Sequence, residues 1–242
     1  MERIIIDKLL DYFISNKLIC KEQHGFVPGK CCTTNLLDAL AIIKLSLSEG
    51  RIIDVIYTDY SKVFDKVNQK NLIHKLEKVV LGDSDWALIT SGVPQGSVLV
   101  LWSDIWDVPL NEKKCKVIRF GKTEEKPSYF IRKRDGSSQK LEISEGEKDL
   151  GVLISSHLKW SNHVNNAVNK ANRMLGIVKR TFKHLDCNSF LLLYQSLIRP
   201  HLDYAVSAWN PSLKQDIQLI EKVQERATKL VNFLKHLKYE DD

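Results

Sequence analysis

The feature that most constrains the fold is a change of hydrophobic periodicity near Trp160. After this residue, apolar side chains recur every three or four positions in three successive stripes, over 164–178, 190–197 and 213–234. Each stripe predicts an amphipathic helix. The second helix should end before Pro200, because a proline disfavours helical backbone in the residue that precedes it. The last third of the chain is therefore predicted to be helical, with its boundary near 157–162.

The first two thirds mix helical and strand patterns. Helices are predicted from residue 4 to about Asn16, from a cap at Thr33 or Thr34 to a stop at Gly50, and over 69–80. The short β-branched stretch 51–58, "RIIDVIYT", predicts a buried strand. Weaker strand patterns follow at 87–90, 116–120, 128–131 and 148–155, and "RDGSS" is typical of a hairpin turn. The fold class predicted is α+β.

Charge and cysteine content narrow the class of protein. A net charge of +6 fits a polyanionic partner without requiring one. No apolar run approaches the roughly 20 residues of a membrane span, so no membrane partner is expected. The cysteines are odd in number, are scattered and form no C-x-x-C pair, so neither a disulfide framework nor a zinc site is expected. Reduced thiols favour an intracellular protein.

Asp59 is the first candidate site residue. It follows the predicted strand 51–58, and a carboxylate at the end of a strand is a common ligand for hard cations such as Mg²⁺. Phe64 lies five residues further on, and Asp65 adjoins it. The residues alone leave two interpretations open, since an aspartate after a strand is most often a cap or turn residue.

Two further stretches have the composition of binding sites. In "SGVPQGS", Gly92 and Gly96 permit close approach of a ligand, Pro94 stiffens the turn, and Gln95 offers both a donor and an acceptor. An ordinary polar turn explains the same residues. The predicted helix after Trp160 carries cations outside its apolar stripe that could contact phosphates, although a solvated helix face is the commoner explanation. These cations are Lys170, Arg173, Lys179 and Arg180.

Several stretches, in this order, resemble reverse transcriptases of non-LTR (LINE-type) retrotransposons. They are "QHGFVPGKCCTTNLLDAL", "DVIYTDYSKVFDKV", "SGVPQGSVL", "NEKKCKVIRFG", "EKDLGVLISSHLKWSNHV" and "LLYQSLIRPHLDYAVSAWNP". The resemblance implies an RNA-directed DNA polymerase of the right-hand type. It divides the chain into fingers-like helices and loop at 1–50, an incomplete palm at 51–158, and a helical thumb and post-thumb region at 159–242.

The resemblance also implies roles for single residues. Asp59 would be a catalytic aspartate that binds Mg²⁺, and Phe64 would screen the 2′ position of the incoming sugar. Pro94, Gln95 and Gly96 would contact the template and the nucleotide, with Lys30 as a cation near them. The partner implied is RNA or an RNA/DNA hybrid.

One part of the family pattern is missing. Relatives carry a hairpin ending in aromatic-Ala-Asp-Asp after the "GVPQGS" loop, whereas here "VLVLWSDIWDVPLN" joins the loop directly to "NEKKCKV". Nucleotidyl transfer in this family uses two Mg²⁺ ions about 3.5–4 Å apart, which a lone aspartate cannot hold. The chain is therefore expected to be an inactive, internally deleted reverse transcriptase. The alternatives are a non-catalytic nucleic-acid-binding remnant and a helical interaction module over 213–235.

Overall fold

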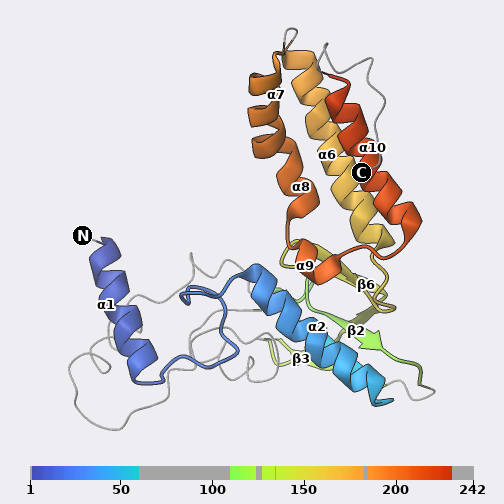
Figure 1. Ribbon diagram of the computed structural model, residues 1–242. Helices are drawn as coiled ribbons and strands as arrows, with labels where there is room; N and C mark the ends of the chain where they lie inside the picture. Colours follow the sequence, from blue (N-terminus) through green and yellow to red (C-terminus); the bar gives the residue numbers. More distant parts are fainter. Residues whose placement is uncertain (1, 60–109, 124–126, 134, 183–184, 231–242) are drawn as a thin grey trace. The chain divides into compact units, whose positions relative to one another are not determined.

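A computed structural model describes residues 2–59, 110–123, 127–133, 135–182 and 185–230, and the chain divides into two compact units, 1–147 and 148–242 (Figure 1). The predicted α+β class is confirmed, since helices and small sheets both occur. The predicted helix 69–80 and strand 87–90 lie outside the described residues. No described helix is long and apolar enough to cross a membrane.

The two helices of the first unit are α1 (Glu2–Ser15) and α2 (Cys32–Ser48). The end of α1 agrees with the sequence prediction, but the predicted cap of α2 at Thr33 or Thr34 is wrong. Cys31 is the N-cap residue, and the Thr34 hydroxyl, one turn into the helix, accepts a hydrogen bond from the Cys31 N–H at 2.9 Å. Thr34 therefore satisfies the backbone of the N-cap residue, as the third residue of a capping box does.

Gly50 ends α2 as predicted. It adopts a φ of +71°, which is favourable for glycine, and its N–H donates to the Leu47 carbonyl at 3.0 Å. The Arg51 N–H donates to the Ser46 carbonyl at 2.9 Å. These two bonds form a Schellman motif, which satisfies carbonyls at the end of the helix.

The main sheet of the first unit has the order β1-β2-β5. Strand β1 (Ile53–Tyr57) runs antiparallel to β2 (Lys116–Phe120), and β2 runs parallel to β5 (Glu142–Ser144). The strand predicted at 116–120 is confirmed, and its Val117, Ile118 and Phe120 are buried. The prediction that 51–58 forms a buried strand is wrong in one respect, because β1 is only half-buried. Among the described residues it pairs with one strand, whereas β2 pairs with two.

A largely buried ion pair joins the two strands. Asp54 of β1 accepts hydrogen bonds from Arg119 of β2, one of them from Nε at 2.6 Å, and from the Tyr129 hydroxyl at 2.8 Å. The Arg119 hydrogen bonds hold the pKa of Asp54 below its usual value of 3.8. Asp54 and Arg119 thus satisfy each other's charge inside the sheet.

A hairpin forms around Asp135 and Gly136, as "RDGSS" predicts. Strand β3 (Phe130–Arg132) pairs antiparallel with β4 (Ser138–Lys140), and Gly136 in the turn has a φ of +82°. The strand predicted at 128–131 thus begins and ends slightly later.

The second unit contains a hairpin where one strand is predicted at 148–155. Strand β6 (Gly146–Asp149) pairs with β7 (Val152–Ser155), and the chain reverses between them at Leu150 and Gly151. Both turn residues have positive φ, +42° and +93°, as in a type I′ turn. The sequence did not predict this turn, because Leu150–Ile154 resembles one apolar strand. Leucine is also an unusual residue at a positive φ.

Helices make up most of the rest of the second unit. They are α6 (Ser161–Thr181), α7 (Cys187–Leu193), the π-helical η1 (Tyr194–Ile198), α8 (Arg199–Asp203), α9 (Val206–Trp209) and α10 (Lys214–Thr228). The predicted apolar stripe of α6 is confirmed, since every member from Val164 to Val178 is buried. Helix α10 lies along α6 (Figure 1) and buries Val223 and Ala227, whereas Leu213 and Ile217 are exposed.

The prediction that the middle helix ends before Pro200 is wrong. The chain passes from α7 through η1 into α8, and Pro200 lies in the first turn of α8. Proline is tolerated there because the N–H groups of a first turn have no partner within the helix. Phe190 and Ile198 are buried, and Leu191 from the predicted stripe is exposed.

Candidate functional site

Asp59 lies two residues beyond the end of β1. Its carbonyl accepts a hydrogen bond from the Asn111 N–H at 2.7 Å, and its carboxylate pairs with Lys114 Nζ at 2.8 Å. The pairing of β1 with β2 explains this contact. Tyr57 lies opposite Lys116, so continuing the antiparallel register by two residues sets Asp59 beside Lys114.

A turn and a buried side chain hold the segment that carries Lys114 in place. A turn closes it, with the Lys114 N–H donating to the Asn111 carbonyl at 2.9 Å, and Cys115 beside it is buried. Burial raises the pKa of the Cys115 thiol above its usual value of 9.0. Cys115 is therefore a neutral core side chain and not a second ligand beside Asp59.

The described residues around Asp59 do not fit a site for two magnesium ions. No group of three or more His, Cys, Asp or Glu residues able to hold a metal occurs in the described part of the chain. The charged partner of Asp59 there is the Lys114 ammonium, which repels a divalent cation. The Asp59–Lys114 pair is largely exposed, so it contributes at most about 1 kcal/mol. A lysine held this weakly is displaced easily. Within the described part of the chain, no group of acidic side chains that could hold two metal ions forms around Asp59.

The other residues predicted around the nucleotide are only partly described. Phe64, Pro94, Gln95 and Gly96 lie outside the described residues, as does Asp65. Lys30 is described and exposed, and its ammonium donates to the Lys21 carbonyl.

The four cations predicted to contact nucleic acid all lie exposed on α6. Arg173 and Arg180 are seven residues apart, so they lie on the same side of the helix, and Lys170 precedes Arg173 by one turn. Lys179 lies about a quarter of a turn away from Arg180. The 21 residues of α6 include no aspartate or glutamate, so this face is uniformly basic.

A hydrogen-bond network around the buried Trp209 and His163 in the second unit was missed by sequence reasoning. The Tyr204 hydroxyl donates to the Leu150 carbonyl at 2.7 Å, and Trp209 Nε1 donates to the Tyr204 carbonyl at 2.7 Å. His163 Nδ1 accepts from the Leu153 N–H at 3.1 Å, and its ring contacts Trp209 edge to face with the ring centres 4.7 Å apart.

This network joins two stretches that carry the family resemblance, 147–164 and 192–211. A usable signal was present, because His163 directly precedes Val164 on the apolar stripe of α6. A buried tryptophan such as Trp209 also usually bonds its indole N–H. The contacts within the second unit therefore give His163, Tyr204 and Trp209 a structural role.

Comparison with protein families, with curated proteins and with solved structures finds no match to this chain.

Proposed function

We propose that this chain is a truncated, internally deleted remnant of a non-LTR retrotransposon reverse transcriptase and that it lacks polymerase activity. The observation that carries the proposal is the position of Asp59, two residues beyond the end of β1, with Lys114 as its charged partner. A catalytic aspartate of this family would stand at such a strand end. The fingers, palm and thumb divisions at 1–50, 51–158 and 159–242 belong to this proposal.

The loss of activity follows from the number of acidic ligands. Mg²⁺ requires near-octahedral oxygen coordination and binds through one or two carboxylates plus substrate phosphates. The sequence has no aromatic-Ala-Asp-Asp motif. Without those carboxylates, two dications lack the negative charge that would hold them close together. Asp59 alone would then bind a magnesium ion only weakly, in competition with Lys114.

Primer extension on an RNA template tests the proposal. The full chain is incubated with a primed RNA, deoxynucleotides and either Mg²⁺ or Mn²⁺, and an active reverse transcriptase serves as the positive control. We expect no extension above background. RNA-templated extension that Asp59→Ala abolishes would overturn the proposal. Because the sequence ends in Tyr239-Glu240-Asp241-Asp242, the double variant D241N/D242N shows whether those carboxylates contribute to any extension seen.

A second function is favoured by the basic face of α6. Exposed Lys170, Arg173 and Arg180 on a helix without acidic residues form a surface that can contact phosphates. We propose that a remnant without polymerase activity still binds RNA or an RNA/DNA hybrid through this face. Such binding is electrostatic, so its affinity should fall steeply with salt, the logarithm of the association constant decreasing by about 0.7–0.9 per phosphate contact for each tenfold rise in salt.

Charge-reversal variants test whether these cations bind nucleic acid or only form a solvated face of the helix. The variant R173E/R180E should weaken binding of a 20-nucleotide RNA and make the salt dependence shallower. Lys222→Glu on the exposed surface of α10, which reverses one charge, is the control and should leave both quantities unchanged. Binding that does not depend on salt, or that Lys222→Glu weakens equally, would count against a role for α6.

A further inference from the structure

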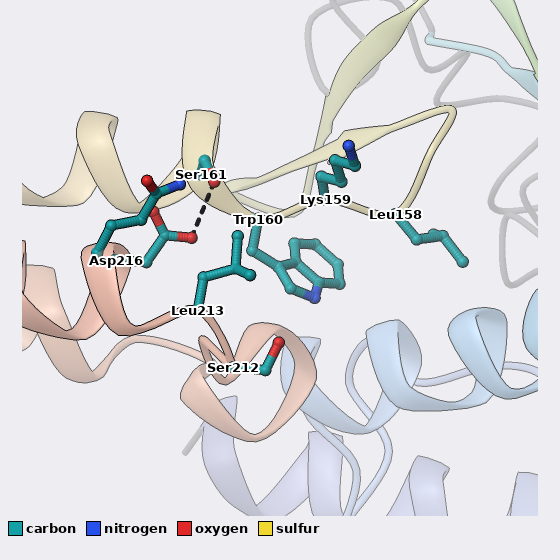
Figure 2. A pocket seen from close by; sticks show the side chains of 8 residues that line it. Leu158, Lys159, Trp160, Ser161, Ser212, Leu213 and Asp216 are labelled. Carbon is teal, nitrogen blue, oxygen red and sulfur yellow. Dashed lines mark hydrogen bonds between the residues drawn. The ribbon is translucent and has the colours of Figure 1, made fainter.

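A pocket in the second unit lies where α6 and α10 begin (Figure 2). Its volume is about 400 Å³, within the range of about 300–1,000 Å³ that is usual for small-molecule sites. Its lining includes Lys159, Trp160 and Ser161 at the start of α6, and Leu213 and Asp216 at the start of α10. No role assigned above uses this pocket.

The polar wall of the pocket is a buried carboxylate. Asp216 is 2% exposed, and its Oδ2 accepts a hydrogen bond from Ser161 Oγ at 2.9 Å. Within the described part of the chain, no lysine, arginine or histidine forms an ion pair with it. The positive ends of the α6 and α10 dipoles favour its negative charge. A carboxylate has about four acceptor positions, and the Ser161 hydroxyl occupies one of them. Asp216 can therefore accept further hydrogen bonds from a ligand.

The apolar wall of the pocket is an aromatic ring. The half-buried indole of Trp160 lies beside Leu213 in Figure 2, and Leu213 separates it from the Ser161–Asp216 hydrogen bond. The exposed Lys159 lies above the indole in the same view. Indole rings stack readily on nucleobases. A lysine next to such a ring can contact a phosphate group. The pocket thus combines a stacking surface, a hydrogen-bond acceptor and a cation.

We propose that this pocket binds a guanine nucleotide. The base stacks on Trp160, its N1–H and 2-amino group donate to Asp216, and the phosphate contacts Lys159. Guanine is the base that presents two adjacent donors on its Watson–Crick edge, and an ionised carboxylate only accepts hydrogen bonds. Adenine and cytosine present an acceptor beside their amino group, which a carboxylate repels. The proposal does not depend on a retrotransposon origin of the chain.

Titration of the full chain with three mononucleotides tests this assignment. GMP, IMP and AMP are compared by isothermal titration calorimetry, and IMP differs from GMP by lacking the 2-amino group. Loss of one good hydrogen bond corresponds to about a tenfold change in Kd, so GMP should bind about tenfold more tightly than IMP and more tightly still than AMP. Equal affinities for GMP and AMP, or no binding of GMP at millimolar concentration, would overturn the proposal.

Two variants assign the contacts, and a third is the control. Trp160→Leu should weaken GMP binding about tenfold through loss of stacking, and Asp216→Asn should remove the preference for GMP over AMP. Lys222→Ala, on the exposed surface of α10, should change neither. Should Asp216→Asn fail to fold, the ranking of nucleotides on the unmodified chain and the Trp160→Leu result still decide the question. Unaltered GMP affinity in folded Trp160→Leu would refute the stacking contact.

The same guanine chemistry can come from a free nucleotide or from single-stranded RNA. Two five-nucleotide RNAs that differ only in a central guanosine or adenosine distinguish these sources. If the guanosine RNA binds more tightly than both GMP and the adenosine RNA, the pocket binds a strand of RNA. Equal affinities for GMP and the guanosine RNA assign it to the nucleotide. Failure to discriminate guanine in both arms would contradict the assignment.

Discussion

Acidification from pH 7 to pH 5 should destabilise the second unit through His163. This side chain is 7% exposed, and its Nδ1 accepts a hydrogen bond from the Leu153 N–H. Burial, with a smaller contribution from the positive charge of Lys170, lowers the pKa of His163 from 6.5 to about 4. Folded His163 is therefore neutral at pH 5, whereas the unfolded chain binds a proton there.

The size and sign of the effect follow from linkage. Stability contributed by the neutral histidine is complete above pH 6.5 and is lost as the pH falls toward 4, because only the unfolded state binds a proton in that interval. Each pKa unit corresponds to 1.36 kcal/mol, so the two pKa values give a loss of about 2 kcal/mol at pH 5 and about 3 kcal/mol well below pH 4.

Urea unfolding at several pH values, followed by tryptophan fluorescence, measures this loss. Trp209 is fully buried against His163 and reports on the second unit. The variant His163→Asn keeps an acceptor near the position of Nδ1 but does not titrate, so its stability should change about 2 kcal/mol less between pH 7 and pH 5 than that of the unmodified chain. His157→Asn, at an exposed position, is the control and should leave the pH dependence unchanged. Equal pH dependence with and without His163, or a His163 titration midpoint near 6.5 by NMR, would refute the reasoning.

Two further substitutions test the packing of each unit. Gly151→Ala adds a Cβ at a φ of +93° and 3.0 Å from the Tyr204 ring. It should therefore lower the unfolding free energy by more than the roughly 1 kcal/mol expected for Gly50→Ala, which has a similar φ and open space around it. Equal losses of unfolding free energy in the two variants would exclude crowding by Tyr204. Asp54→Asn removes the negative charge that faces the largely buried Arg119 and should lower the unfolding free energy by about 3–5 kcal/mol. A loss below about 1 kcal/mol in denaturant unfolding would show that water reaches this pair.

Periodicity predicted the elements that one repeat pattern governs. The stripe from Val164 to Val178 placed α6 correctly because burying that face stabilises the helix irrespective of its neighbours. The strand at 116–120 was predicted for a similar reason, since its β-branched and aromatic residues suit a sheet. Gly50 and Gly136 marked chain reversals because their positive φ strongly favours glycine.

Prediction failed where a tertiary contact decides the local conformation. Leu150 adopts a positive φ in a turn whose carbonyl accepts the Tyr204 hydroxyl, a residue 54 positions further along the chain. Pro200 was expected to stop a helix, yet the chain re-enters helix through the π-helical turn before it. Neither the turn at Leu150 nor the helix at Pro200 can be predicted from the few residues around it. At the candidate site, the sequence identified Asp59 at a strand end but not Lys114 beside it, because that pairing depends on the register of β1 and β2.

The bonds that Tyr204 makes at both ends have a consequence for how this chain can tolerate rearrangement. Its hydroxyl holds the Leu150 turn and its carbonyl holds the Trp209 indole, so both anchors belong to the stretch after residue 147. Insertions or losses of sequence upstream leave the length of every chain segment between these anchors unchanged. Sequence changes before residue 148 therefore need not disturb the hydrogen bonds that connect the turn at Leu150 with Tyr204 and Trp209.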